Sequence, residues 1–217
     1  PDAPSRRTMV DVNVRATLCL GEWARKKGIP LIFISSSTIY ADPYKPGIQE
    51  SDKKAEAPGL GGFYGHSKLA AERILQLLSS DGLSLCILRP SSIYGTGLKE
   101  NKLIAQCLAA ALQGQTLRLS PPVDDRINLI HASDVERAAL EALRNEAGGV
   151  FNVAAAAETS VLDLARACIA AVGKGDVSAA SGAAKPASVR FKLDCGAART
   201  AFGFRPRIEI HEGLARM

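Results

Sequence analysis

The chain alternates between short continuous apolar runs and longer segments whose hydrophobic residues recur at helical spacing. The continuous apolar run 30–35 predicts a strand buried on both faces, as in a parallel sheet, and further strands are predicted over 84–88, 126–130 and 150–153. The longer segments predict helices over 8–27, 64–79, 101–113, 134–144 and 160–172. Gly28 stops the first of these helices, and Ser133 is a candidate N-cap of the fourth. The alternation predicts the α/β fold class, with a doubly wound parallel sheet.

Two connections depart from this regular pattern. The polar, Pro- and Gly-rich stretch 41–62 is too long for an ordinary connection, so it is either a binding loop or a flexible insertion. The Gly- and Ala-rich stretch 173–187 is predicted to be a loose connection. The chain contains no internal repeat.

Tyr64 and Lys68 are four residues apart at the start of a predicted helix, which places both side chains on one helical face. A cation near a phenol lowers its pKa from about 10 and lets it act as an acid or base near neutral pH. Alone, the spacing is a weak signal. The structural alternative is a tyrosine at a helix start beside a solvated lysine.

The hydroxyl-rich run Ser35-Ser36-Ser37-Thr38 follows the first predicted strand. The carboxyl ends of strands are where open α/β sheets bind ligands, so a hydroxyl here can hold a substrate oxygen beside the phenol. Ordinary turns and caps also use serine at strand ends. A buried strand, a Ser/Thr run, a long loop and a helix with Tyr64 and Lys68 together form a more specific arrangement.

The whole order of motifs resembles the extended short-chain dehydrogenases/reductases of the NAD-dependent epimerase/dehydratase family, which includes UDP-galactose 4-epimerase. The similar segments are Asn13–Thr17, Ile34–Tyr40, Tyr64–Glu72, Arg89–Gly95, Ile130–Asp134, Phe151–Val153, Ala201–Pro206 and Glu212–Leu214. The resemblance therefore extends through almost the whole chain. It implies a Rossmann-type sheet and a small C-terminal substrate-binding lobe.

The resemblance also implies roles for individual residues. Tyr64 is implied as the catalytic acid/base, Lys68 as the group that lowers its pKa and holds the nicotinamide ribose, and Ser36 as the anchor of the reacting oxygen. Alternative substrate hydroxyls are Ser37 and Thr38. The implied nicotinamide-lining residues are Pro90, Ser91 and Ile93. No metal site is implied.

Several residues at the family's substrate-binding positions differ from the family pattern. Ser92 and Ile127 stand where nucleotide-sugar enzymes often have Asn and Arg, and the nearest arginine, Arg126, is one position early. Near the C-terminus only Lys185 and Arg190 approximate the family's phosphate-binding arginine. The candidate substrate-binding residues beyond the hydroxyl run are therefore Ser92, Arg126 and Lys185. The sequence leaves the identity of the substrate undetermined.

Three polar residues within the matching motifs have structural interpretations. Arg89 can be a structural ion-pair partner, His131 a strand-end histidine and Asp134 a helix N-cap.

The glycine-rich turn that cradles a dinucleotide pyrophosphate, G-x-x-G-x-x-G, does not occur in the chain. The resemblance therefore implies that Pro1 is an internal position of a longer protein. Residues 1–95 are expected to form the C-terminal part of the NAD(P)-binding domain, and 96–217 mainly the substrate lobe, with 131–153 returning to the sheet. The chain by itself is expected to be inactive.

Composition narrows the choice of partners and compartment. The 27 Lys and Arg against 22 Asp and Glu are scattered, without a basic face interleaved with aromatics, so no nucleic-acid partner is expected. No apolar run approaches the roughly 18 residues of a membrane span, and no signal peptide opens the chain, so no membrane partner is expected. The five dispersed cysteines fit neither a disulfide framework nor a zinc site and favour a cytoplasmic location.

The resemblance further implies a homodimer whose interface is a four-helix bundle built from the helices 8–27 and 64–79. Trp23, Leu69 and Leu77 are the candidates for burial between subunits.

The expected function is an NAD(P)-dependent epimerase/dehydratase-type oxidoreductase acting on a small molecule, in first place a nucleotide sugar, with NAD or NADP as cofactor of the intact protein. One alternative is a reductase of a small non-nucleotide carbonyl compound. Another is a non-catalytic, dinucleotide-sensing relative, which would be favoured if Tyr64 and Lys68 were missing; both are present.

Overall fold

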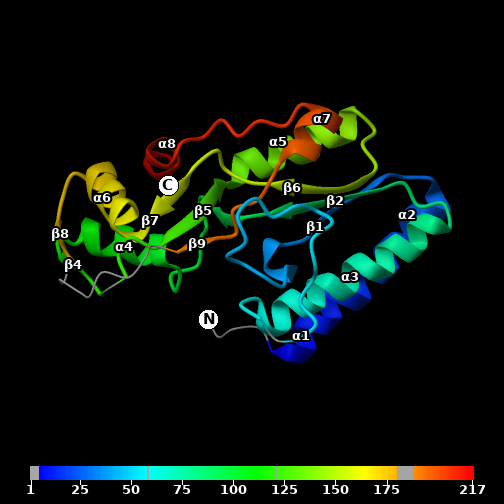
Figure 1. Ribbon diagram of the computed structural model, residues 1–217, viewed down its shortest axis with the longest axis horizontal. Helices are drawn as coiled ribbons and strands as arrows, with labels where there is room; N and C mark the ends of the chain where they lie inside the picture. Colours follow the sequence, from blue (N-terminus) through cyan, green and yellow to red (C-terminus); the bar gives the residue numbers. More distant parts are fainter. Residues whose placement is uncertain (1–4, 58, 121, 180–187) are drawn as a thin grey trace.

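The computed structural model describes residues 5–57, 59–120, 122–179 and 188–217. Its central sheet is parallel, in the order β1-β2-β6, with β1 spanning Leu31–Ile34, β2 Leu85–Pro90 and β6 Gly149–Val153. Every residue of β2 is buried, which matches its continuous apolar run. This sheet lies at the middle of the long axis of the molecule (Figure 1).

Helices cover both faces of the sheet (Figure 1). On one face, α1 (Arg6–Val10), a π-helical turn (Asp11–Arg15) and α2 (Ala16–Lys27) run as one helix along α3 (Gly62–Ser80). On the other face lie α5 (Ala132–Arg144) and α7 (Gly196–Phe202). The fold is therefore a Rossmann-type α/β arrangement with parallel strands, as predicted.

A second group of elements forms the other end of the molecule. One small sheet has the order β3-β5-β7, from Ser92–Tyr94, Arg126–His131 and Glu158–Ser160, with β9 (Val189–Arg190) beside β5. A two-stranded sheet pairs β4 (Thr116–Leu119) with β8 (Asp176–Ala179). The helices here are α4 (Leu103–Leu112), α6 (Val161–Val172) and α8 (Ile210–Ala215).

The predicted helices and apolar strands are present, with small shifts at their ends. Gly28 ends α2 in the left-handed conformation, as predicted. The N-cap of α5 was predicted wrongly: His131 rather than Ser133 caps it, and the His131 Nδ1 accepts the Ser133 N–H at 3.2 Å. The stretch 173–187 was also misjudged in part, because β8 lies within it; residues 180–187 are outside the described residues.

The long loop 41–62, apart from residue 58, is held against the sheet domain. Ile48 is 1% exposed and packs with Ile39 and Leu69. Its N–H donates to the Lys192 carbonyl at 2.8 Å, and its own carbonyl accepts the N–H of Asp194 at 2.8 Å. The described part of the loop therefore does not behave as a flexible insertion, because an apolar anchor and backbone bonds fix its middle.

A buried ion pair joins α3 to β2. Arg89 donates from Nε to Glu72 Oε1 at 3.0 Å and from Nη2 to Glu72 Oε2 at 2.7 Å. Arg89 also donates to the Tyr40 hydroxyl at 3.1 Å and to the Glu50 carbonyl at 2.9 Å. The structural ion-pair interpretation of Arg89 is thus confirmed, and the pair fixes the helix that carries Tyr64 against the central strand.

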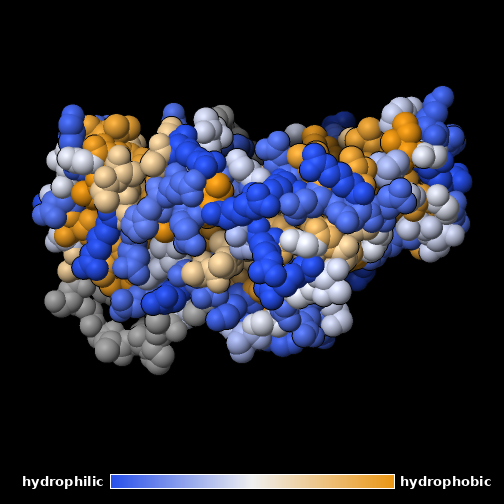
Figure 2. Space-filling view, turned by 90° about the horizontal axis from the view of Figure 1, so that it is seen from above, coloured by the Kyte–Doolittle hydropathy of each residue, from blue (hydrophilic) through white to orange (hydrophobic). Residues whose placement is uncertain are grey.

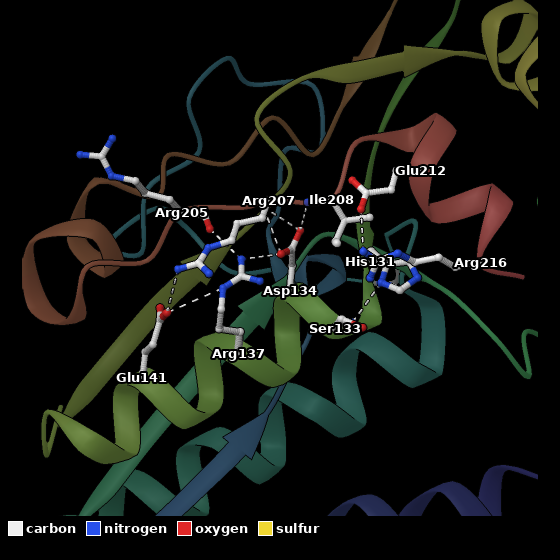
Figure 3. A network of polar contacts seen from close by, with 10 residues as sticks. All are labelled: His131, Ser133, Asp134, Arg137, Glu141, Arg205, Arg207, Ile208, Glu212 and Arg216. Carbon is white, nitrogen blue, oxygen red and sulfur yellow. Dashed lines mark hydrogen bonds and ion pairs between the residues drawn. The ribbon is translucent and has the colours of Figure 1, made fainter.

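Asp134 fastens the C-terminal segment to α5 (Figure 3). Its carboxylate accepts the backbone N–H groups of Arg207 and Ile208 at 3.0–3.1 Å and pairs with Arg137. Arg137 also donates to the Arg205 carbonyl at 2.8 Å. Asp134 is therefore an anchor for residues 205–208 rather than the N-cap that the sequence suggested.

The face that includes α5 and α7 is mainly hydrophilic, and hydrophobic residues gather toward the two ends of the long axis (Figure 2).

The described residues contain no helix with the length and apolarity needed to cross a membrane. Within those same residues, no group of three or more His, Cys, Asp or Glu side chains is placed to hold a metal ion.

Candidate active site

A cleft of about 750 Å³ lies between the sheet domain and the second group of elements. On the sheet side it is lined by the hydroxyl run 35–38, by Tyr64 and by residues 90–93 at the end of β2. On the other side it is lined by Leu98, Lys99, Asn101, Lys102, Leu103, Ile104, Ile127, Leu129 and Leu164. The position matches the carboxyl ends of parallel strands, where α/β sheets bind ligands.

Ser36 and Tyr64 lie together in this cleft. Ser36 has an extended backbone and caps the short 3₁₀ helix Ser37–Ile39, accepting the Thr38 N–H at 3.2 Å, and its Oγ is 2.9 Å from Thr38 Oγ1. Burial raises the pKa of the Tyr64 phenol, and the nearby Ser36 hydroxyl opposes that rise. Tyr64 is still 41% exposed, so a ligand in the cleft can reach its hydroxyl.

Two glycines let α3 approach the hydroxyl run closely. A Cβ on Gly65 would lie 2.9 Å from the Thr38 carbonyl oxygen, and one on Gly61 would lie 2.5 Å from the same atom. Real Cβ atoms do not approach that closely, so only glycine permits this contact. The first turn of α3, with Tyr64 on it, is thereby set directly against residues 36–38.

Lys68 is half-buried and does not line the cleft. Its ammonium donates to the Ile34 carbonyl at 2.9 Å and lies 4.8 Å from the centre of the Phe33 ring. Burial lowers the pKa of Lys68, and Glu72 opposes this. In this structure Lys68 does not lower the pKa of Tyr64. Burial raises that pKa, and the group that opposes the rise is Ser36.

A further residue, Asn13, supports the position of Tyr64. It lies on the π-helical turn, lines the cleft, and donates to Ser67 Oγ at 2.9 Å. Ser67 in turn donates to the Tyr64 carbonyl at 2.8 Å. Sequence reasoning gave Asn13 no role, although it opened one of the matching motifs.

The residues expected at the nicotinamide all line the cleft: Pro90, Ser91 and Ile93. The Ser91 hydroxyl is already used, donating to Asn128 Oδ1 at 2.7 Å, whereas Ile93 is 41% exposed. Their place in the cleft follows from β2, which ends at Pro90, and from β3, which begins at Ser92.

The expected substrate-binding residues are divided by the structure. Ser92, Ser37 and Thr38 line the cleft. Arg126 is exposed and does not, because side chains alternate along β5 and it is Ile127 and Leu129 that face the cleft. The prediction of Arg126 as a cleft residue is therefore wrong in this structure, and Lys185 lies outside the described residues.

A Rossmann-type sheet with Tyr64 and Ser36 in one cleft at its carboxyl edge is the arrangement expected of an extended short-chain dehydrogenase/reductase. The sequence profile of the family described as "NAD dependent epimerase/dehydratase family" matches residues 3–154. The chain belongs to this family.

Characterised relatives match nearly the whole chain. The chain is 23% identical to UDP-glucuronic acid decarboxylase 6 of Arabidopsis thaliana over 213 residues, covering 96% of this chain and 62% of the relative. It is 28% identical to UDP-glucose 4-epimerase of Mycolicibacterium smegmatis over 212 residues, covering 94% of this chain and 66% of the relative. The chain thus spans about three fifths to two thirds of these relatives' lengths.

Solved structures share the fold. MoeE5 in complex with UDP-glucose and NAD superposes with a TM-score of 0.80 at 26% identity, covering 97% of this chain and 71% of that one. UDP-N-acetylglucosamine 4-epimerase from Bacillus cereus gives a TM-score of 0.81 at 22% identity, covering 99% and 74%. At its lower identity, the second likeness bears on the fold alone.

Proposed function

We propose that this chain is the catalytic part of an NAD-dependent epimerase/dehydratase-type oxidoreductase that acts on a nucleotide sugar, with Tyr64 as its acid/base. The observation that carries the proposal is the presence of Tyr64 and Ser36 in one cleft of about 750 Å³ at the carboxyl edge of the sheet. Membership of the family and the nucleotide-sugar substrates in the relatives' names support it.

In this proposal the Tyr64 oxygen takes the proton from a substrate hydroxyl and returns it later in the cycle. Ser36 holds the same substrate oxygen by a hydrogen bond and keeps it beside the phenol. Because burial raises the pKa of Tyr64, the phenol has to lose its own proton before its oxygen can take one from the substrate. A cation that moved toward the phenol would lower this pKa, and Lys68, one helical turn further along α3, is the residue we assign to that role.

The residues around the cleft fit a nicotinamide. Ser35 Oγ lines the cleft, is buried and has no hydrogen-bond partner within the described residues, so it is able to hydrogen-bond a polar group of a ligand. We assign Lys68, Pro90, Ser91 and Ile93 to hold the nicotinamide riboside. NAD bound there would supply the acceptor and donor of hydride at the substrate carbon.

The glycine-rich pyrophosphate turn is absent from the sequence, so we expect this chain alone to bind dinucleotide weakly or not at all and to be inactive. Calorimetric titration of the chain with NAD and with NADP tests this. Tight binding of either would contradict it.

Tyr64→Phe tests the proposed chemistry, made in a protein that carries this chain together with a glycine-rich dinucleotide-binding half. We expect turnover of UDP- or dTDP-sugars to fall by about 10²- to 10⁴-fold while cofactor affinity is nearly unchanged. Tyr44→Phe is the control, since Tyr44 is 52% exposed and does not line the cleft. A Tyr64→Phe enzyme that keeps more than about a tenth of the parental rate would reject Tyr64 as the acid/base and favour a non-catalytic role.

One observation favours a second candidate, a reductase of small carbonyl compounds. Ile127 stands where nucleotide-sugar enzymes of the family often have an arginine, and together with Leu129 it makes this wall of the cleft apolar. Screening the same protein with simple ketones beside UDP- and dTDP-sugars separates the two candidates.

A further inference from the structure

Two buried cysteines lie in the core of the second group of elements and take no part in the proposed chemistry. Cys107 is on α4 and is 3% exposed, and Cys168 is on α6 and is 0% exposed. Both belong to one cluster of buried hydrophobic residues, and both are free thiols in this structure. A free cysteine is usually an ordinary core residue, so a chemical role depends on whether the two thiols face one another.

The backbone places the two cysteines at the same level of two neighbouring helices. α4 is followed by β4 and α6 by β8, and the two strands pair in parallel with Thr116 opposite Asp176. Each helix ends four residues before its strand begins, and the helices pack against each other, so they run side by side in the same direction (Figure 1). Cys107 is five residues before the end of α4 and Cys168 four residues before the end of α6. The two positions therefore differ by about one residue, or 1.5 Å, along the helix axes.

Both cysteines lie on buried faces of these helices. The buried residues of α4 are Ile104, Cys107 and Ala111, which form one stripe at helical spacing. On α6, Cys168 follows Ala167, and both are buried. The small alanine side chains allow the helices to approach closely. A disulfide needs such an approach, because its two Cα atoms lie within about 7 Å of each other.

The acidities of the two thiols agree with this placement. The neighbouring Cys168 thiol lowers the pKa of Cys107, although burial opposes the change. The neighbouring Cys107 thiol raises the pKa of Cys168, and burial raises it further. For each thiol the other is thus the largest influence, and Cys107 is the one that ionises first. Cys86 differs, because burial alone raises its pKa to about 11.

We propose that Cys107 and Cys168 are a redox-active pair that hydrogen peroxide oxidises to a disulfide, which fastens α4 to α6. The Cys107 thiolate attacks one peroxide oxygen, the O–O bond breaks, and a sulfenic acid forms while the other oxygen leaves as water after protonation. The Cys168 sulfur then attacks the Cys107 sulfur, and the second oxygen leaves as water with the Cys168 proton. Two thiols thus lose two electrons in total, and one peroxide is reduced to two water molecules. The inference does not depend on the proposed function.

The disulfide would act on the wall of the cleft. Ile104 is three residues before Cys107 and Leu164 is four residues before Cys168, so each lies one helical turn from a cysteine. Both Ile104 and Leu164 line the cleft, on the side opposite Tyr64. A bond between the helices would fix the spacing of these two wall residues. It would also close a loop of about 60 residues, which restricts the unfolded chain.

Peptide mapping of the whole chain tests the pair. The folded protein is treated with hydrogen peroxide, its remaining thiols are alkylated in denaturant, and a non-reducing tryptic digest is analysed by mass spectrometry. Cys107 falls in the peptide 103–118 and Cys168 in the peptide 167–174. We expect these two peptides to be joined, and dithiothreitol to separate them. Cys86, 4% exposed, is the internal control and should remain a thiol that can be alkylated, because burial alone acts on it.

Two variants and a thermal melt extend the test. Cys86→Ala should still form the link, whereas Cys168→Ala should leave Cys107 without a partner. The oxidised wild type should melt at least about 4 °C above the reduced protein, because the closed loop lowers the entropy of the unfolded chain. Cys168→Ala should show no such rise after peroxide treatment.

A link between 103–118 and 167–174 in the folded wild type, reversed by dithiothreitol and kept in Cys86→Ala, supports the redox pair. Two thiols that stay reduced in the folded protein, or a link that forms only in urea, overturn it. Equal oxidation of Cys86 and Cys107 without a link also overturns it, because Cys107 would then be an ordinary buried thiol. A link that leaves the melting temperature unchanged overturns the fastening of α4 to α6. If Cys168→Ala does not fold, the wild-type and Cys86→Ala maps decide.

Discussion

Gly213 lies directly against the phenol of Tyr94: a Cβ on Gly213 would be 2.1 Å from Tyr94 Oη and 2.7 Å from Cζ. Tyr94 ends β3 beside the cleft, and Gly213 is a buried residue of α8. The backbone of Gly213 does not need the left-handed region, so the requirement for glycine is steric. The glycine of the terminal Glu-Gly-Leu motif is therefore explained by a contact with the motif Arg89–Gly95, far away in sequence.

Gly213→Ala should lower the free energy of unfolding by about 1–3 kcal/mol, because the rigid phenol cannot move away from the new methyl group without disturbing its neighbours. Urea denaturation measures this. Adding Tyr94→Phe should recover part of the loss, since it removes the Oη contact but leaves the contact with Cζ. Gly148→Ala is the control, with no atom nearer than 3.8 Å to its Cβ, and should stay within about 0.5 kcal/mol. An unchanged Gly213→Ala protein would show that α8 shifts freely.

Glu72→Ala should cost about 3–5 kcal/mol of stability, because it leaves the Arg89 guanidinium charged and buried without its carboxylate. The two side chains are only 1% and 4% exposed. Glu56→Ala removes a carboxylate from the Lys53 pair, which is 70–77% exposed, and should cost less than about 1 kcal/mol. Chemical denaturation of both variants checks the contrast, and similar losses would contradict a special role for the buried pair.

Tyr94→Phe should make the protein more resistant to alkali. Burial, with nearby carboxylates led by Asp134, raises the pKa of Tyr94 from 10.0 to about 12. The folded state therefore prefers the neutral phenol: this contribution to stability is complete below pH 10, where unfolded tyrosine is also neutral, and is lost as pH rises toward 12. The loss is at most about 1.4 kcal/mol per pH unit.

Wild type and Tyr94→Phe are compared by urea denaturation from pH 8 to pH 11. The variant should be within about 1 kcal/mol of wild type at pH 8, because Tyr94 Oη has no hydrogen-bond partner in the described residues, and should lose less stability above pH 10. Tyr44→Phe, at an exposed tyrosine, should follow wild type. Parallel curves for all three proteins would show that Tyr94 ionises as freely when folded as when unfolded.

The local pattern of hydrophobic residues was enough to predict the helices and strands whose own sequence shows how they are buried. The run 30–35 forms β1, and a strand buried on both faces has a continuous apolar sequence. The segment 64–79 forms most of α3, and a helix buried along one face has hydrophobic residues at helical spacing. The short strands β3, β7 and β9 were not predicted, since they depend on partners distant in sequence. The segment 196–204, whose Phe202 and Phe204 pack in the core of the sheet domain, was not assigned to that domain for the same reason.

The residues of the candidate site that belong to sequence motifs could be predicted, and those that only the folded path of the chain brings to the cleft could not. Ser36 and Tyr64 both line the cleft, as their motifs implied. Arg126 was expected to bind substrate but does not line the cleft. It stands one residue before Ile127, and adjacent residues of a strand point to opposite faces. No pattern in the sequence marks Lys99 and Lys102 as residues that line the cleft, because the path of the chain between β3 and α4 brings them there.

Association through the α2 and α3 helices gives the last prediction. Leu69 was expected to be buried between subunits, but it is 7% exposed and packs with Ile39 and Ile48 inside one chain, so it is not available. Trp23 and Leu77 are 53% and 69% exposed, and exposed large apolar residues are typical of interaction surfaces. We therefore expect a homodimer in which Trp23 and Leu77 become buried.

Leu77→Asp should shift the sedimentation equilibrium toward monomer, because a carboxylate placed in an apolar interface loses its hydration without gaining a partner. Leu143→Asp is the matched control: Leu143 is 46% exposed but lies on α5, on the opposite face of the sheet. Analytical ultracentrifugation of the three proteins over a range of concentrations should show an association constant reduced at least about tenfold for Leu77→Asp, which corresponds to 1.4 kcal/mol, and nearly unchanged for Leu143→Asp. A wild-type chain that stays monomeric at every concentration, or equal losses in both variants, would mean that this face is not the interface.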